Sequence, residues 1–215
     1  MVKNKRFNPK FDIDILIEKF DIKKFEYPSS LENWWSKSVF FTSEEEETLI
    51  KLSKRFDDLC WSCNDEEFKI QLLGIFFFYM DLDVKYEIKT YFERRLARLV
   101  KDIRLNVMVN CFLGKPTLMR TLPVKTYFIL QVFKKTKSEK IDAQCEMLTA
   151  MLIAQDRNKD NKPIYGCWID GPDWYFAVLE GSDYNTSRSY NATSRYQMEY
   201  IVSAFRTLKT LILNR

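Results

Sequence analysis

One stretch of the sequence, residues 123–181, constrains the fold more than any other. It contains a short apolar run, 127–133, whose β-branched and aromatic residues are typical of a buried strand. A helical pattern follows after Asp142, a residue type that caps helix N-termini. Two more apolar runs then flank Asp170-Gly171, a dipeptide that favours a hairpin. A strand, a helix and a hairpin in this order predict an α/β fold in which the helix crosses between two strands.

Helical patterns dominate the chain before this stretch. One short helix is predicted over 11–20, and another around Trp34 and Trp35, which cannot both face the same way on a helix. Bases could stack on one of these rings, but packing in the core is the favoured role. A longer helix opens at Thr42 or Ser43, because acidic residues fill the turn that follows. We therefore expect residues 1–63 to form an N-terminal helical extension.

The next helix, over 66–79, follows Asn64 or Asp65 as a cap. Apolar residues occupy nearly all faces of this helix, which predicts that the helix is buried. Residues 90–100 and 103–113 then alternate apolar and polar positions, and they predict an antiparallel pair of strands.

The end of the chain completes the expected core. Residues 184–193 are polar with tyrosines and fit either an edge strand or a loop, whereas 194–213 predict a last helix. Together with the earlier patterns, they predict that 64–215 form a core with a mixed central β-sheet flanked by helices, within one compact domain.

Composition limits the class of protein. A length of 215 residues with 46% hydrophobic content fits one sizeable core. A formal net charge of +4 permits binding to nucleic acid but does not require it. The N-terminus lacks the apolar segment of a signal peptide, and no apolar run is long enough to span a bilayer. We therefore expect a soluble, cytoplasmic protein without a membrane partner.

The cysteine and histidine counts narrow the chemistry. Five cysteines, an odd number, suit a reducing compartment with free thiols. Cys60 and Cys63 form a C-x-x-C motif, but it closes a helix, and a structural zinc site needs four cysteine or histidine ligands. Ordinary thiols at a helix end are the favoured interpretation. The absence of histidine excludes Ser-His-Asp and Cys-His catalysis.

Three segments in the second half of the chain resemble one nuclease superfamily. They read QVFKK, DAQCEMLTAMLIAQDRN and PIYGCWIDGPDWYFAVLEGSDY, in this order. The pattern is similar to bacterial members of the PD-(D/E)XK, or restriction-endonuclease-like, superfamily, in which a strand ending in EFKK or EYK precedes such a helix and hairpin. The resemblance runs from about residue 64 to the C-terminus, and it implies a restriction-endonuclease-like core.

The resemblance also implies a metal site, but this sequence lacks some of the residues that form it. Such families hold Mg²⁺ between an Asp on one strand and a Glu on the next, and a Lys two residues after the Glu orients the attacking water. Here the Asp position falls on Asn110 and the Glu position on Val132, so that only Lys134 is kept. A hard cation is expected to bind poorly without either carboxylate. Gln131 should point to the opposite face of the strand.

Two acidic residues could compensate for the lost ligands. Glu67 matches the Glu that the first core helix often supplies in such families, and Glu146 of the crossover helix could move into a ligand role. In that case the protein would be an active Mg²⁺-dependent nuclease. Without such compensation we assign no metal ligand and no cofactor.

The favoured hypothesis is a degenerate nuclease fold that binds DNA or RNA, or that serves as a non-catalytic partner. Lys135 and Lys137, after the strand, and Arg94 and Arg98, on the strand pair, are the candidates for phosphate contacts. For the arginines, an ordinary solvated strand face is the favoured explanation. The alternatives are an active nuclease with relocated ligands and a protein–protein interaction module, or homo-oligomer, that kept only the fold.

Overall fold

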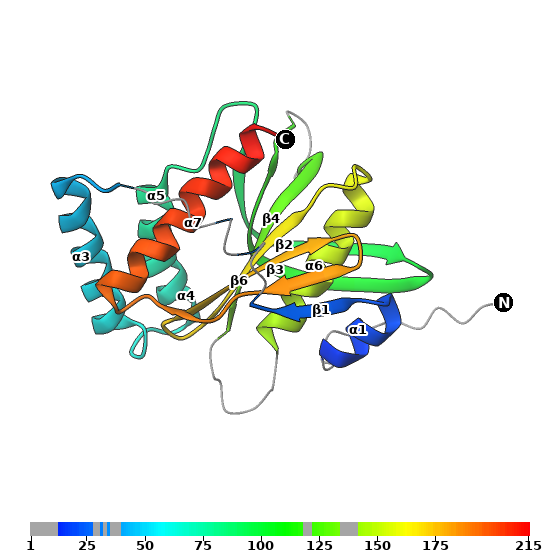
Figure 1. Ribbon diagram of the computed structural model, residues 1–215, viewed down its shortest axis with the longest axis horizontal. Helices are drawn as coiled ribbons and strands as arrows, with labels where there is room; N and C mark the ends of the chain where they lie inside the picture. The colour runs from blue at the N-terminus through cyan, green and yellow to red at the C-terminus, as the bar shows by residue number, and fades with distance from the viewer. Residues whose placement is uncertain (1–12, 28–30, 32–33, 35–39, 118–121, 134–141) are drawn as a thin grey trace.

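A single mixed β-sheet forms the middle layer of the protein, and helices cover both of its faces (Figure 1). The computed structural model describes residues 13–27, 31, 34, 40–117, 122–133 and 142–215. The elements in chain order are α1 (Ile13–Phe20), β1 (Lys23–Glu26), α3 (Ser43–Leu59), α4 (Asp65–Phe68), the π-helical segment η1 (Lys69–Gly74), α5 (Ile75–Met80), β2 (Lys89–Val100), β3 (Ile103–Lys115), β4 (Lys125–Phe133), α6 (Ala143–Asn158), β5 (Ile164–Asp170), β6 (Asp173–Glu180), β7 (Asp183–Thr186), β8 (Tyr190–Asn191) and α7 (Arg195–Leu213).

The strands lie in the order β1-β7-β6-β5-β4-β3-β2, and β8 pairs with β6. β2, β3 and β4 are antiparallel neighbours, and α6 carries the chain from β4 to the parallel strand β5. The hairpin of β5 and β6 turns at Asp170-Gly171, as predicted. The structure therefore confirms an α/β fold with a mixed, open sheet, an antiparallel strand pair and a crossover helix.

Two hydrophobic cores lie on opposite faces of the sheet. α3, α4, α5 and α7 gather on one side, and α1 and α6 lie on the other (Figure 1). Neighbouring residues of β4 separate the two cores, because Phe128 belongs to the first and Ile129 to the second. In the first core the ring of Trp174 contacts those of Phe56, Phe76 and Phe205. The strands therefore connect both cores into one unit.

The predicted helix caps are present. Thr42 forms a capping box with Glu45 at the start of α3. The side chain of Asn64 accepts hydrogen bonds from the backbone of Glu66 and Glu67 at the start of α4. Asp142 caps α6. Each cap satisfies N–H groups that have no partner within the helix.

Three features differ from the sequence-based expectations or refine them. β1 was not predicted, because its four residues are all exposed; its backbone pairs with β7, which is thus an inner strand. The helix over 66–79 is not fully buried, because one of its faces carries exposed Ile70 and Phe78. Trp34 has the packing role, since its ring is buried and its Nε1 donates to the carbonyl of Ala204 (3.2 Å); Trp35 lies outside the described residues.

The remaining general expectations concern cysteines, membranes and domains. None of the five cysteines, all of which lie in the described residues, forms a disulfide bond, and Cys111, Cys145 and Cys167 are buried. Within the described part of the chain, no helix has both the length and the apolar character that a membrane span requires. The division of the chain at residue 63 stays a prediction.

Candidate functional site

The ribbon of β2 and β3 is kinked where Glu93 faces Asn110. Glu93 has a φ of 48°, a left-handed value that is uncommon for a residue other than glycine. The ladder pairs Phe92 with Cys111 and Arg94 with Val109, but the intervening pair is missing. The buried face also switches here, because Val109 and Cys111 belong to different cores. Strand irregularities of this kind gather near functional sites.

β3 and β4 separate at the same level, and side-chain amides bridge the gap. The backbone ladder ends at the pair of Cys111 and Leu130. Beyond it, the N–H of Asn110 donates to Gln131 Oε1 (3.0 Å), and the N–H of Val132 donates to Asn110 Oδ1 (2.9 Å). We call Asn110 and Gln131 the amide fork. Its two side chains replace the backbone hydrogen bonds that the diverging strands have lost.

Two carboxylates flank the amide fork. Asn110 Nδ2 donates to Glu93 Oε1 (3.1 Å), and Lys69 Nζ lies 2.7 Å from the same oxygen. On the other side, Gln131 Nε2 donates to Glu146 Oε2 (3.3 Å) and to the carbonyl of Met108 (2.7 Å). A continuous polar chain therefore links η1, β2, β3, β4 and α6.

The surroundings of Glu146 favour its neutral form. Burial raises the pKa of its carboxyl group to about 7, and the nearby carboxylate of Asp142 acts in the same direction. A carboxyl group with a pKa near neutrality is able to take up or release a proton under ordinary conditions. The hydrogen bond from Gln131 is compatible with both forms, since a carboxyl group keeps an acceptor oxygen when it is protonated.

The structure brings two of the predicted site residues together. Asn110 and Glu146 meet through Gln131. Glu67 is not part of this group: its Oε2 accepts the backbone N–H of Asn64 (2.8 Å), so that it completes the cap of α4. Lys69, two residues farther along, is the residue of this helix that reaches the site, and the sequence analysis missed it. The exposed ion pair with Glu93 has no signature in the sequence.

Three of the predicted residues cannot be placed, because Lys134, Lys135 and Lys137 lie outside the described residues. Gln131 points to the face opposite that of Val132, as predicted: Gln131 is fully buried and joins Asn110 to Glu146, whereas Val132 packs against the other core. Gln131 was left out of the predicted site because the Glu position was assigned to Val132. The ladder between β3 and β4 ends at Leu130, so that the amide of Gln131 bridges the two strands. A glutamine within an apolar run was the available signal, since a buried amide needs partners.

The two predicted arginines differ in their surroundings. Arg98 forms an ion pair with Asp156 of α6, and both side chains are about one third exposed. Arg94 is exposed, and its Nη1 donates to the carbonyl of Glu93 (3.3 Å). Arg94 is therefore more accessible to a phosphate group than Arg98.

No protein-family model matches this chain, and no curated protein matches its sequence. The chemistry of the site therefore rests on its geometry.

The amide fork is poorly suited to a divalent cation. Mg²⁺ and Ca²⁺ prefer several carboxylate oxygens, but the oxygens of Asn110 and Gln131 already accept backbone hydrogen bonds. Glu93 is neutralised by Lys69, and Glu146 is drawn toward its protonated form. Within the described residues, no group of three or more histidine, cysteine or acidic side chains is placed to hold a metal.

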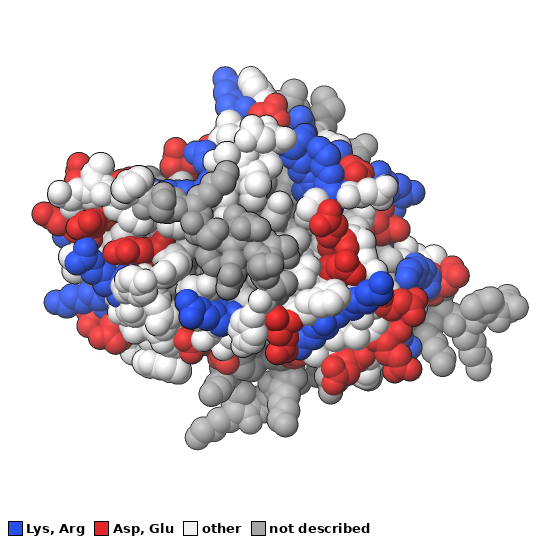
Figure 2. Space-filling view, in the orientation of Figure 1, with Lys and Arg blue, Asp and Glu red and all other residues white. Residues whose placement is uncertain are grey.

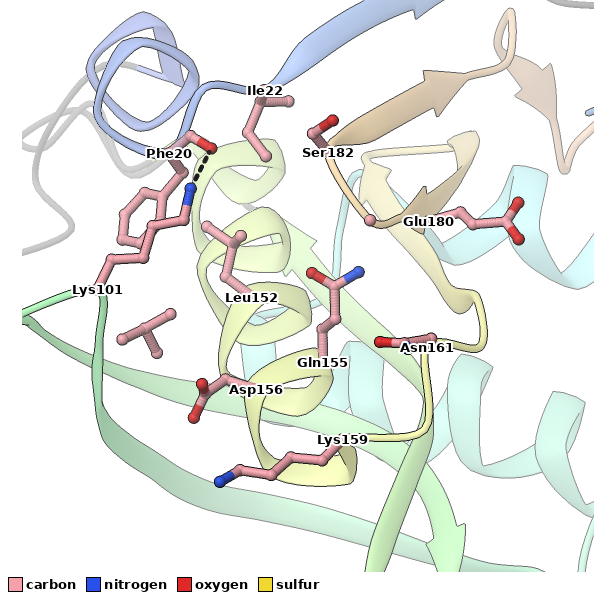
Figure 3. A pocket seen from close by; sticks show the side chains of 12 residues that line it. Phe20, Ile22, Lys101, Leu152, Gln155, Asp156, Lys159, Asn161, Glu180 and Ser182 are labelled. Carbon is pink, nitrogen blue, oxygen red and sulfur yellow. Dashed lines mark hydrogen bonds between the residues drawn. The ribbon is translucent and has the colours of Figure 1, made fainter.

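A separate cavity of about 630 Å³ lies at the far end of α6 (Figure 3). Its walls include Phe20, Leu152 and Gln155, and Lys101 Nζ donates to the carbonyl of Phe20 (3.2 Å). The amide of Gln155 points into the cavity, whereas Glu180 points away from it (Figure 3). The cavity shares no residue with the amide fork and belongs to a different part of the molecule.

Proposed function

We propose that this protein is a non-catalytic member of a PD-(D/E)XK-like fold that binds nucleic acid through the ribbon of β2 and β3. The amide fork is the observation that carries the proposal. Asn110 and Gln131 stand on the two neighbouring strands that supply carboxylates in the superfamily that the sequence resembles. Uncharged amides whose oxygens are already hydrogen-bonded hold a hard cation weakly.

The strand order supports the proposed fold. An antiparallel run of β2, β3 and β4, followed by α6 and a parallel β5, is the arrangement that the resemblance implies. If Gln131 instead of Val132 is aligned with the metal-binding Glu, the match to the catalytic motif becomes weaker. The position of the Lys, two residues later, then falls on Phe133, which has no amine. No residue of the motif would then keep its chemistry.

The charge of the ribbon supports the proposed partner. Residues 89–115, which span β2 and β3, contain seven Lys and Arg and two Asp and Glu, so that seven minus two gives +5. The formal net charge of the whole chain is +4, which means that the rest of the chain carries −1. Arg94, Arg95 and Arg104 are exposed on this ribbon. On the face seen in Figure 2, by contrast, basic and acidic residues are interspersed.

Binding to labelled double-stranded DNA and RNA across a salt series tests the proposal. The wild type should bind more weakly as the salt concentration rises, because each phosphate contact releases counterions. The double variant Arg94→Ala/Arg95→Ala should bind about tenfold more weakly. The slope of its affinity against salt concentration should correspond to about one or two fewer phosphate contacts. Lys51→Ala/Lys54→Ala removes the same charge from exposed positions of α3 and should bind like the wild type.

The same preparations, incubated with Mg²⁺ or Mn²⁺, test the catalytic part of the proposal. We expect intact nucleic acid. Metal-dependent cleavage that is lost in Glu146→Gln would show an active nuclease with relocated ligands. If neither nucleic acid is bound at low salt, or if both double variants lose binding equally, the ribbon is not a nucleic-acid surface.

A further inference from the structure

One face of the helix formed by α4, η1 and α5 exposes apolar side chains to solvent. Ile70 is 72% exposed and Phe78 is 87% exposed, and Gly74 lies midway between them. From Ile70 to Phe78 the chain makes about two helical turns, slightly less than one in the π-helical segment and slightly more than one in the α-helical segment, so that these three residues lie in line. We call Ile70, Gly74 and Phe78 the apolar stripe. Large exposed side chains in one line, next to a cavity, are typical of an interaction site.

The cavity beside the apolar stripe has a volume of about 590 Å³ and lies between α5 and β2. Its apolar walls come from Phe77, Phe78, Leu82 and Phe92. The rings of Phe77 and Phe92 are 6.0 Å apart, and they join the helix to the edge strand. Aromatic-lined hollows of this kind can receive the anchor residues that dominate the energy of protein interfaces.

The charged groups around the stripe are acidic at both of its ends. Asp81 and Asp83 are the charged residues that line the cavity, and both are exposed. Glu66 and Glu67 are exposed at the other end of the helix. Lys69, beside the stripe, already pairs with Glu93, and Lys209 lies 3.7 Å from Asp81. The two ends of the stripe therefore favour positive charge in whatever covers it.

This charge pattern disfavours a second copy of the chain as the occupant. In an antiparallel two-fold arrangement, Glu66 and Glu67 of one copy would meet Asp81 and Asp83 of the other. A parallel arrangement would also bring equal charges together, and like charges oppose association. A small molecule could fill the cavity, but it would leave Ile70 uncovered. An elongated partner with basic ends fits both observations.

We propose that the apolar stripe and its cavity bind an amphipathic helical segment of another protein. Its apolar face carries an aliphatic or aromatic anchor for the cavity, and lysine or arginine flanks that face at both ends. This is the helix-in-groove mode of recognition, in which apolar anchors three or four residues apart enter a groove. The proposal uses neither the amide fork nor nucleic acid, so it stands independently of the proposed function.

Fluorescence anisotropy with two labelled helical peptides tests this proposal. Both peptides carry leucine and phenylalanine anchors at helical spacing; one has lysines at both ends and the other has glutamates. The wild type should bind the lysine peptide at least about tenfold more tightly than the glutamate peptide. Ile70→Ser and Phe78→Ser should each weaken that binding about tenfold, because they remove a contact at the interface.

Three controls make the result decisive. Ile70→Ser and Phe78→Ser should keep the circular dichroism spectrum and unfolding midpoint of the wild type, because both side chains are exposed. Ile50→Ser removes an exposed side chain of α3, 45% accessible, and should bind the lysine peptide like the wild type. Asp81→Asn should weaken binding of the lysine peptide but not binding of the glutamate peptide.

Several outcomes would overturn the proposal. Equal affinity for the two peptides, binding that persists in both stripe variants, or no binding to the lysine peptide would each contradict it. Analytical ultracentrifugation provides a further check. A wild-type dimer that Phe78→Ser dissociates would show that a second copy covers the stripe.

Discussion

Gln131 is fully buried in the middle of an apolar strand, and its surroundings follow from that burial. A buried amide without partners is costly, by about 1–3 kcal/mol for each unsatisfied group. The carbonyl of Met108, the N–H of Asn110 and the carboxyl of Glu146 supply those partners. Glu146 is partly buried beside this amide. Its carboxyl group is close to an amide rather than to a positive charge.

Glu146→Gln should change the pH dependence of stability. The pKa of Glu146 is about 7 in the folded protein, above its ordinary value of 4.5. The stabilisation that comes from protonating it is therefore complete below about pH 4.5 and is lost as the pH rises through 7. Relative to Glu146→Gln, the wild type should lose about 1–2 kcal/mol between pH 4.5 and 8, a reduced value because the side chain is partly exposed to solvent.

Urea unfolding at several pH values measures this difference. Glu180→Gln, at an exposed position, is the matched control and should follow the wild type. A difference between wild type and Glu146→Gln that stays constant with pH would show that the pKa of Glu146 is not raised.

At the scale of elements, the turn region between β3 and β4 depends on Gly114. The ladder shifts register between Leu113 and Gly114. A Cβ at Gly114 would collide with the carbonyl oxygen of Lys125 and would lie 2.6 Å from the Cβ of Pro123. Gly114→Ala should therefore destabilise the protein by about 1–3 kcal/mol, since the neighbours are backbone and a rigid ring.

Gly74→Ala is the matched substitution. Its Cβ would lie 3.4 Å from the carbonyl of Lys69, so that the methyl group fits, and alanine favours a helix over glycine by about 1 kcal/mol. Chemical denaturation should show opposite shifts of the two midpoints. Equal shifts would mean that the strands can relax around Gly114.

Local sequence signals predicted most of the elements, but not the places where the strands depart from regularity. The caps at Thr42, Asn64 and Asp142 and the alternation in β3 follow from residue type and spacing. β1 has no such pattern, because its pairing uses backbone groups alone. The site was predicted in part: Asn110 and Glu146 meet, but Gln131 and Lys69 were missed. A kink that redirects side chains depends on tertiary contacts, and regular alternation does not reveal it.

At the scale of the whole molecule, the single sheet joins two cores through adjacent residues of β4. Phe128 and Ile129 are both fully buried, but they face opposite cores. Phe128→Ala and Ile129→Ala should each destabilise the protein by about 2–5 kcal/mol. Because both cores share the strands, unfolding of either core should unfold the whole sheet in one transition.

Thermal unfolding followed by near- and far-ultraviolet circular dichroism checks this expectation. The two signals should give the same midpoint for the wild type and for both variants. Separate midpoints in Ile129→Ala would show that the side of α6 unfolds independently of the aromatic core.

The kink at Glu93 also bears on how the sheet ends. β2 is an edge strand of twelve residues, and an edge of that length could recruit strands from other chains into an aggregate. The left-handed backbone at Glu93 interrupts its row of free N–H and C=O groups near the middle, and the charges of Arg94 and Arg95 follow at once. An incoming strand would meet two short segments of β2 that run in different directions. The irregularity beside the amide fork thus disfavours the addition of a further strand along this edge.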